Sequence, residues 1–167
     1  ANFEEGTGTV IFDGISQTQV SADETFYNLT ISKSSSSYNA VDLATGVTVT
    51  VLSDLYINNG CVEMNSNSVI DVDSMLTIAS GAGLNASGDN NLNIYVGLLW
   101  DNQNTSYSTN YGFNPGVSST VTFDGLNFGQ IGSSATYEEF YNLHANVTLG
   151  MVNVVTGLRV LGDLTVD

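Results

Sequence analysis

The chain has 167 residues and a formal net charge of −15, from 17 acidic and 2 basic side chains. Nucleic acids and anionic membrane surfaces are held by many Lys and Arg side chains, so neither is an expected partner, and no apolar stretch is long enough for membrane insertion. Hydrophobic residues make up 42% of the sequence and charged residues 11%, which favours a folded core over a disordered acidic tail.

From the N-terminus, the clearest strand patterns lie in residues 47–57 and 70–78, where apolar and polar residues alternate. The apolar positions are Val47, Val49, Val51, Leu55 and Ile57, then Ile70, Val72, Leu76 and Ile78. A period of two predicts strands with one face in a core and the other in solvent. Helical periodicity does not stand out anywhere, so we expect an all-β fold.

A Leu-x-Ile motif, or a close variant of it, recurs about every twenty residues. Its copies are Leu29-Ile31, Leu55-Ile57, Leu76-Ile78, Leu92-Ile94, Leu143-Ala145 and Leu164-Val166. About twenty residues is the length of one turn of a parallel β-solenoid, with two or three short strands in each turn.

A longer repeat, of about 111 residues, contains the short one. The segment Thr9-Val10-Ile11-Phe12-Asp13-Gly14 returns as Thr120-Val121-Thr122-Phe123-Asp124-Gly125, and Phe26-Tyr27-Asn28-Leu29 returns as Phe140-Tyr141-Asn142-Leu143. Gln19 and Gln130 lie between the two motifs in their respective copies. We therefore expect residues 1–118 to form a first repeat and residues 119–167 to begin a second, incomplete repeat of the same continuous solenoid.

The predicted fold is thus a parallel β-solenoid, with right-handed coiling as the rule for parallel crossovers. An antiparallel sandwich is the competing architecture, because it also uses short strands at regular spacing. The two-level repetition favours the solenoid.

Residues 97–112 interrupt the strand pattern and contain the only tryptophan, so we expect them to form a protruding loop. Trp100, Tyr107 and Tyr111 could stack on sugar rings beside the Asn102 amide, or they could pack on the flank of the solenoid. These four residues are the candidate glycan contacts.

Alternating carboxylates at Asp71 and Asp73 are the candidate metal ligands. Carboxylate oxygens suit calcium, but no complete calcium-loop pattern is present, and solvated surface carboxylates are the simpler interpretation. We expect no other cofactor.

The motif order resembles repeats of very large secreted surface proteins of Bacteroidota. Phe-x-x-Gly, Thr-Val-x-Phe-x-Gly, a Gln, and Phe-Tyr-Asn-Leu-Thr-Ile follow in order, and Trp100-Asp101-Asn102 precedes the turn at 113–116. The resemblance implies a β-solenoid adhesin or surface fibre that leaves the cell by the type IX secretion route. Neither end of the sequence shows a capping pattern, so we expect its partners to be flanking repeats of the same polypeptide or copies of itself stacked end to end. The aromatic residues of 97–112 add surface glycans as expected ligands.

We therefore expect a non-catalytic, structural or adhesive segment of an extracellular filament protein. The first alternative is a carbohydrate-binding module that uses residues 97–112. The second is a β-helix enzyme that degrades polysaccharide, which would need a converging carboxylate pair or a basic catalytic residue. Lys33 and Arg159 are the only basic side chains, and they lie far apart in sequence, which makes the enzyme the weakest hypothesis.

Overall fold

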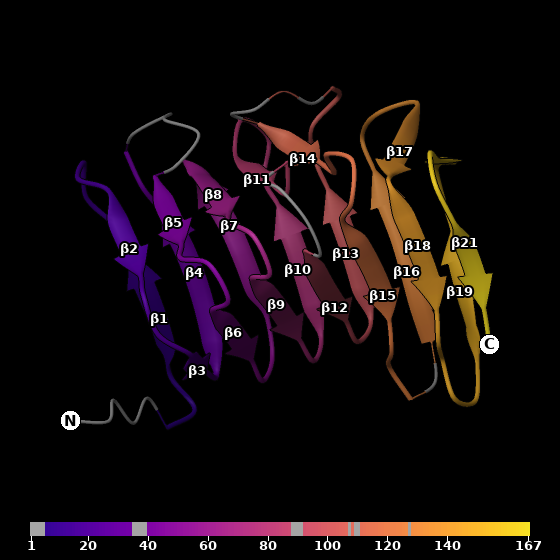
Figure 1. The fold of residues 1–167 in the computed structure, drawn as a ribbon, viewed down its shortest axis with the longest axis horizontal. Helices are drawn as coiled ribbons and strands as arrows, with labels where there is room; N and C mark the ends of the chain where they lie inside the picture. The colour runs from indigo at the N-terminus through magenta and orange to yellow at the C-terminus, as the bar shows by residue number, and fades with distance from the viewer. Residues whose placement is uncertain (1–5, 35–39, 88–91, 107, 109–110, 127) are drawn as a thin grey trace.

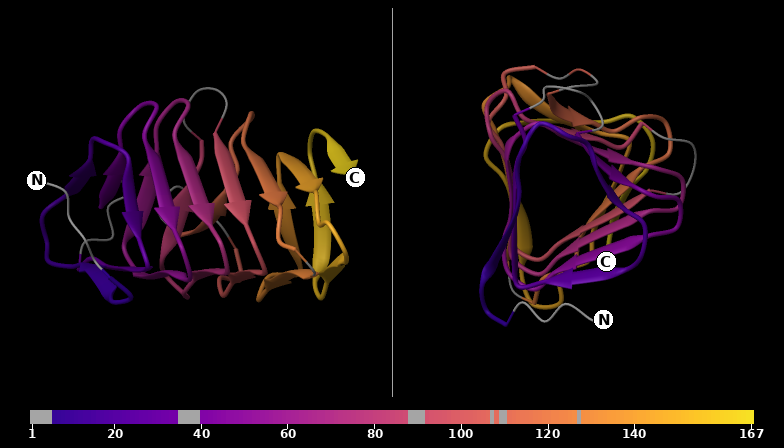
Figure 2. Two further views of the ribbon diagram at one scale, coloured as in Figure 1. Left: turned by 90° about the horizontal axis from the view of Figure 1, so that it is seen from below. Right: turned by 90° about the vertical axis from the view of Figure 1, so that its left-hand side faces the viewer.

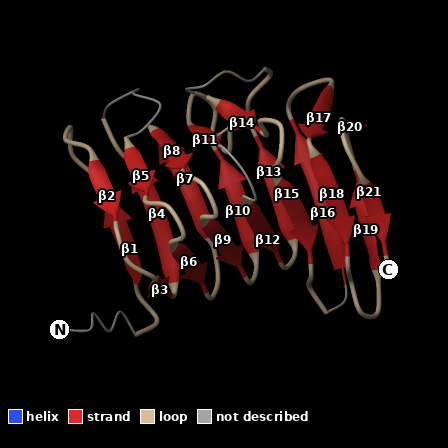
Figure 3. Cartoon of the chain, viewed as in Figure 1, coloured by secondary structure: helices blue, strands red, loops and turns tan. Residues whose placement is uncertain are grey.

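The computed structural model describes residues 6–34, 40–87, 92–106, 108, 111–126 and 128–167. Within these residues every regular element is a β-strand, and 21 strands follow one another along the chain (Figures 1 and 3). No helix in this part of the chain is long and apolar enough to cross a membrane. The predicted all-β fold is confirmed.

The chain winds around one long axis and has three sides in cross-section (Figure 2). Each side is a parallel sheet whose strands come from successive turns, so nearly every strand pairs with the strand three places later in the chain. This is the predicted parallel β-solenoid.

Two sides are continuous along the whole axis. Sheet A contains β1 (Thr9–Phe12), β4 (Asn28–Ser32), β7 (Leu55–Asn59), β10 (Met75–Ile78), β13 (Leu99–Asn102), β16 (Phe128–Ser133) and β19 (Met151–Val154). Sheet C contains β3 (Glu24–Phe26), β6 (Thr48–Val51), β9 (Val69–Val72), β12 (Asn93–Val96), β15 (Thr120–Phe123), β18 (Asn142–Ala145) and β21 (Leu164–Val166).

The third side is divided into two sheets. Sheet B contains β2 (Thr18–Val20), β5 (Val41–Leu43), β8 (Cys61–Met64), β11 (Gly83–Asn85) and β14 (Gly112–Asn114). Sheet D contains only β17 (Tyr137–Phe140) and β20 (Gly157–Val160). The ladder on this side is therefore interrupted between β14 and β17.

Identical side-chain types stack along the axis because the strands pair in register. Leu29 pairs with Leu55, and Leu55 pairs with Leu76. All three are buried, so the Leu-x-Ile motifs of sheet A do mark successive turns. The next position in this column is Trp100, which pairs with Leu76 on one side and Ile131 on the other.

The Leu92-Ile94 copy of the motif does not belong to that column. Ile94 lies in β12 of sheet C, where it pairs with Ile70 and Val121. The short spacing from Leu76 to Leu92 is therefore part of one turn, and the column continues at Trp100. A large aromatic residue in place of leucine concealed this step from the sequence pattern.

The two copies of the long repeat correspond strand for strand, with β1–β7 matching β15–β21. Equivalent pairs are Val10↔Leu29 and Val121↔Leu143, Gln19↔Asp42 and Gln130↔Asn153, and Phe26↔Val51 and Phe140↔Val160. The matching strands lie on different sides, however: β1 is in sheet A and β15 is in sheet C. Fourteen strands do not fill a whole number of three-strand turns, so the second copy is rotated by one side.

One polar contact is also reproduced in both copies. The Asn28 side-chain oxygen accepts a hydrogen bond from the Asp54 N–H at 3.3 Å, and the Asn142 side-chain oxygen accepts one from the Asp163 N–H at 2.9 Å. The repeated Phe-Tyr-Asn-Leu motif therefore uses its asparagine to hold the backbone of the next turn.

The expected protruding loop over residues 97–112 is corrected by the structure. Residues 99–102 form β13 within sheet A, and β14 begins at Gly112. Between these strands residues 103–106, 108 and 111 are described, and none of them belongs to a strand. Aromatic and amide residues were mistaken for loop residues because the strand signal relies on aliphatic alternation.

Replacing Leu76 by Ala is expected to lower the free energy of unfolding by about 2–5 kcal/mol, because a fully buried side chain leaves a cavity between two neighbouring turns. The matched control is Met75→Ala, which changes the neighbouring, solvent-facing residue of β10 and should alter stability by about 0.5 kcal/mol or less. Urea unfolding followed by circular dichroism measures both. Equal losses would contradict the assignment of inner and outer faces.

Candidate functional site

An aromatic cluster occupies the interruption between sheets B and D. Trp100 of β13 lies edge-on to Phe113 of β14, with ring centroids 4.7 Å apart, and to Phe140 of β17 at 5.2 Å. Phe113 and Phe140 are themselves 5.8 Å apart. All three rings are buried, so aromatic packing takes the place of the missing backbone ladder between β14 and β17.

A buried carboxylate lies against this cluster. Glu138 of β17 is only 2% exposed, and its Oε1 accepts a hydrogen bond from the Trp100 indole N–H at 2.9 Å. The Asn102 side-chain amide donates to both carboxylate oxygens, at 3.1 and 3.2 Å. These donors offset the desolvation of the carboxylate, because a buried charge is tolerated only when it is hydrogen-bonded.

Burial raises the pKa of Glu138 to about 6, from an ordinary value of 4.5. Hydrogen bonds from Asn102, Ser133 and Trp100 favour the ionised form and limit the rise, whereas the nearby Asp101 carboxylate increases it. The carboxylate is fully engaged in holding β13 to β17, which is a structural use of an ionisable group.

The polar network extends from Glu138 to the next corner of the solenoid. The Asn102 side-chain oxygen accepts hydrogen bonds from the backbone and side-chain N–H groups of Asn104, at 3.2 and 3.0 Å. The Asn104 amide also donates to the carbonyls of Ala79 and Ala82, and its oxygen accepts from Gly81 N–H at 2.8 Å. The network therefore links three successive turns through buried side chains.

The structure corrects two of the predicted glycan contacts. Trp100 and Asn102 are buried and bonded to Glu138, so neither presents a surface to a sugar. Tyr111 is 39% exposed, and Tyr107 lies outside the described residues. The expected platform of Trp100, Asn102 and Tyr111 is therefore not assembled on the surface.

The two predicted metal ligands lie near a third carboxylate. Asp71 is in β9, and Asp73 follows that strand at the corner that Asp124 occupies two turns later. Burial raises the pKa of Asp71, and the charges of Asp124 and Asp73 raise it further. Among the described residues, no group of three or more His, Cys, Asp or Glu side chains is arranged to hold a metal ion.

The remaining reactive or ionisable side chains lie apart from one another. Burial, followed by the charge of Glu63, raises the pKa of the Cys61 thiol to about 12. The Lys33 ammonium is buried and donates to the Asp13 carbonyl at 2.6 Å and the Thr18 hydroxyl at 2.9 Å. Arg159 pairs with Glu139 at 2.8 Å, and His144 pairs with Asp167 at 2.7 Å.

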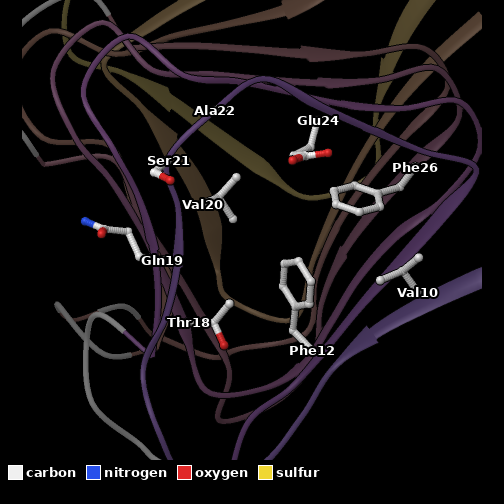
Figure 4. A pocket seen from close by; sticks show the side chains of 9 residues that line it. All are labelled: Val10, Phe12, Thr18, Gln19, Val20, Ser21, Ala22, Glu24 and Phe26. Carbon is white, nitrogen blue, oxygen red and sulfur yellow. The ribbon is translucent and has the colours of Figure 1, made fainter. Parts of the chain in front are cut away.

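A hollow lies at the N-terminal end of the solenoid. It has a volume of about 410 Å³ and is surrounded by side chains of the first turn (Figure 4). The lining residues are Val10, Phe12, Thr18, Gln19, Val20, Ser21, Ala22, Glu24 and Phe26. We call this hollow the N-terminal mouth. It is the end of the hydrophobic core, open to solvent.

The opposite end is open in the same way. A hollow of about 360 Å³, here called the C-terminal mouth, is lined mainly by aliphatic side chains of the last turns. They include Ile131, Leu143, Val152, Val154, Leu158, Leu164 and Val166. Both mouths are bordered by strands with one unpaired edge, since β1–β3 and β19–β21 are terminal in their sheets.

The sequence patterns named several apolar residues of the two mouths but did not single out Glu24 or Glu138. The long repeat contains a signal for them, because Glu24 and Glu138 each lie two residues before the repeated Phe-Tyr-Asn-Leu motif. The partnership of Glu138 with Trp100, 38 residues away, depends on the winding of the chain.

Comparisons with protein-family models, with curated proteins and with solved structures find no match. The class of protein is therefore defined by the fold itself, which is a parallel β-solenoid.

Replacing Asp71 by Asn is expected to raise the melting temperature at pH 7, because it removes a charge that Asp124 and Asp73 repel. The raised pKa favours the neutral acid in the folded state, so the stability cost of ionisation develops as pH rises above the ordinary value of about 4. The gain should therefore shrink when the two proteins are compared near pH 4 by calorimetry.

The same measurement in calcium and in chelator tests the metal hypothesis. A calcium site at Asp71 and Asp73 would make Asp71→Asn lower the melting temperature in calcium. Solvated carboxylates predict the increase in both buffers.

Replacing Glu138 by Gln is expected to remove a pH-dependent loss of stability. Because its folded pKa is about 6, wild-type Glu138 favours the folded state fully below pH 4.5 and loses about 2 kcal/mol of that contribution as pH rises through 6. Gln keeps an acceptor for the Trp100 indole and has no charge to desolvate. The difference in unfolding free energy between the two proteins, measured from pH 4 to 7.5, should grow with pH.

Glu138→Leu is the control for the hydrogen bonds. It also lacks the charge, but it leaves the indole and amide N–H groups without an acceptor, so it should be less stable than Glu138→Gln at every pH by about 1–3 kcal/mol. A Gln variant with the wild-type pH dependence would contradict the role given to Glu138.

Proposed function

We propose that this chain is a non-catalytic structural segment of an extended extracellular β-solenoid, in a cell-surface fibre or adhesin. The observation that carries the proposal is the pair of open mouths. Each mouth presents apolar side chains beside strands that are terminal in their sheets, a surface to which further turns can be added in register.

The winding of the chain supports a mechanical role. Backbone hydrogen bonds run along the axis in sheets A and C through seven strands each, so a load along the axis is shared by parallel ladders. Each turn contacts mainly its neighbours, and length is gained by adding turns without changing the core. A stiff rod that extends from a surface is the function this geometry supports best.

The charge distribution supports assembly along the axis over assembly side by side. The net charge is −15, and the outer faces of the strands carry residues such as Asp42, Asp71 and Asp101. Like charges on the flanks of neighbouring rods repel, whereas the two mouths are mainly apolar. The surface chemistry therefore disfavours lateral bundling and leaves the ends as the attractive surfaces.

The non-catalytic part of the proposal is supported by the use of the reactive side chains. Glu138 is bonded to Trp100 and Asn102, and Lys33 is buried against a backbone carbonyl. The Cys61 thiol is protonated at neutral pH, since its pKa is about 12. Each of these groups is used in packing or in holding adjacent turns together.

Antibodies against the folded chain should label intact cells of the source organism. In electron micrographs the label should follow thin rods or fibres, and protease treatment of intact cells should remove the native protein. Cells in which the gene is deleted are the control. Labelling that requires cell lysis, or labelling without elongated structures, would contradict the proposal.

A further inference from the structure

The N-terminal mouth has a covered counterpart inside the same molecule. Four apolar side chains of the mouth, Val10, Phe12, Val20 and Phe26, hold the repeat positions of Val121, Phe123, Ile131 and Phe140. All four residues of the second copy are completely buried. In the first copy Val10 and Phe12 are only partly buried, and the group opens into the hollow of about 410 Å³ (Figure 4).

The cover of the second copy is the turn formed by β12, β13 and β14. Ile94 of β12 pairs with Val121, and Trp100 of β13 pairs with Ile131. Phe140 is covered by the rings of Trp100 and Phe113, at 5.2 and 5.8 Å. These three strands therefore show which side chains complete a surface of this type.

The polar part of the surface is also duplicated. Glu138 lies two residues before Phe140 and pairs with Leu158, while Glu24 lies two residues before Phe26 and pairs with Val49. Glu138 is buried under the cover and accepts hydrogen bonds from Trp100 and Asn102. Glu24 is exposed and lines the mouth (Figure 4).

We propose that the N-terminal mouth binds a further solenoid turn with the side-chain chemistry of strands β12, β13 and β14, whose indole and amide N–H groups donate hydrogen bonds to Glu24. This inference rests on the proposed function, because it assumes that further turns cover this end of the solenoid in the native protein. The occupant supplies an aliphatic strand, a tryptophan with an asparagine two residues later, and a phenylalanine strand.

A second copy stacked through its C-terminal mouth fits this surface less well. The last turn offers the aliphatic side chains Val152, Val154, Leu158, Leu164 and Val166. None of these can donate a hydrogen bond to Glu24. In addition, β19–β21 correspond to β5–β7, and the turn that covers those strands in the first copy is β8–β10. The two mouths therefore belong to different positions of the repeat.

The test extends the chain at its N-terminus. Residues 1–8 are replaced by a second copy of residues 61–119, so that Ser119 precedes Thr9 as it precedes Thr120 in the present sequence. The extended chain should unfold at a higher temperature than the native chain. The fluorescence of its added tryptophan should be that of a buried indole, as expected for Trp100.

The hydrogen bond is tested by Glu24→Ala in both chains. The substitution should lower the melting temperature of the extended chain by about 2–4 °C and leave that of the native chain nearly unchanged, because Glu24 is exposed there. Met75→Ala, at a solvent-facing residue of β10 in the middle of the native chain, is the control and should act equally in both chains. Replacing the added tryptophan by Ala should abolish most of the difference that Glu24→Ala makes.

Three results would overturn the inference. The first is that the added tryptophan has the fluorescence emission of a solvent-exposed indole, both in this extension and in a shorter extension that carries residues 82–119. Another is an equal effect of Glu24→Ala on the native and extended chains. The third is concentration-dependent association of the native chain in analytical ultracentrifugation that Glu24→Ala abolishes, which would make a second copy the occupant. Failure of the surface-labelling experiment would leave these results unchanged, so the two proposals are tested separately.

Discussion

The fold depends on in-register pairing between each strand and the strand three places later. Because parallel pairing places equivalent residues directly above one another, every inward position becomes a column along the axis, as Leu29, Leu55 and Leu76 illustrate. A column accepts a change of size only where the neighbouring columns compensate. Trp100 follows Leu76 in its column, and the adjoining ladder is interrupted between β14 and β17 beside it.

The same constraint explains why the long repeat does not return to its own side. A repeat of fourteen strands on a three-sided coil falls one strand short of five full turns, so the second copy begins in sheet C instead of sheet A. The inward columns of the three sides are mainly aliphatic or aromatic, so most of the motif can move between sides without losing its packing. In a longer array of this repeat, any outer surface feature would recur on each side in succession.

The aromatic cluster and Glu138 place an apolar group and a charged group side by side in the core. Three rings exclude water from the gap between sheets B and D, and the carboxylate among them requires donors, which Trp100 and Asn102 supply. The turn that bears these donors and the turn that bears the acceptor are thereby matched to each other. An apolar neighbour in place of Trp100 and Asn102 would leave the buried carboxylate without these donors.

The sequence by itself determined the fold class, because alternating aliphatic residues and short repeats record the inward columns directly. It also recorded the equivalence of Glu24 with Glu138, since a repeat preserves residue types at equal positions. It did not determine that Trp100 and Asn102 are buried, because aromatic and amide residues are common both in loops and in cores. Only the tertiary structure decided that, by winding Glu138 to within 2.9 Å of the Trp100 indole. It also decided which side each copy of the repeat occupies, because that depends on how many strands complete a turn.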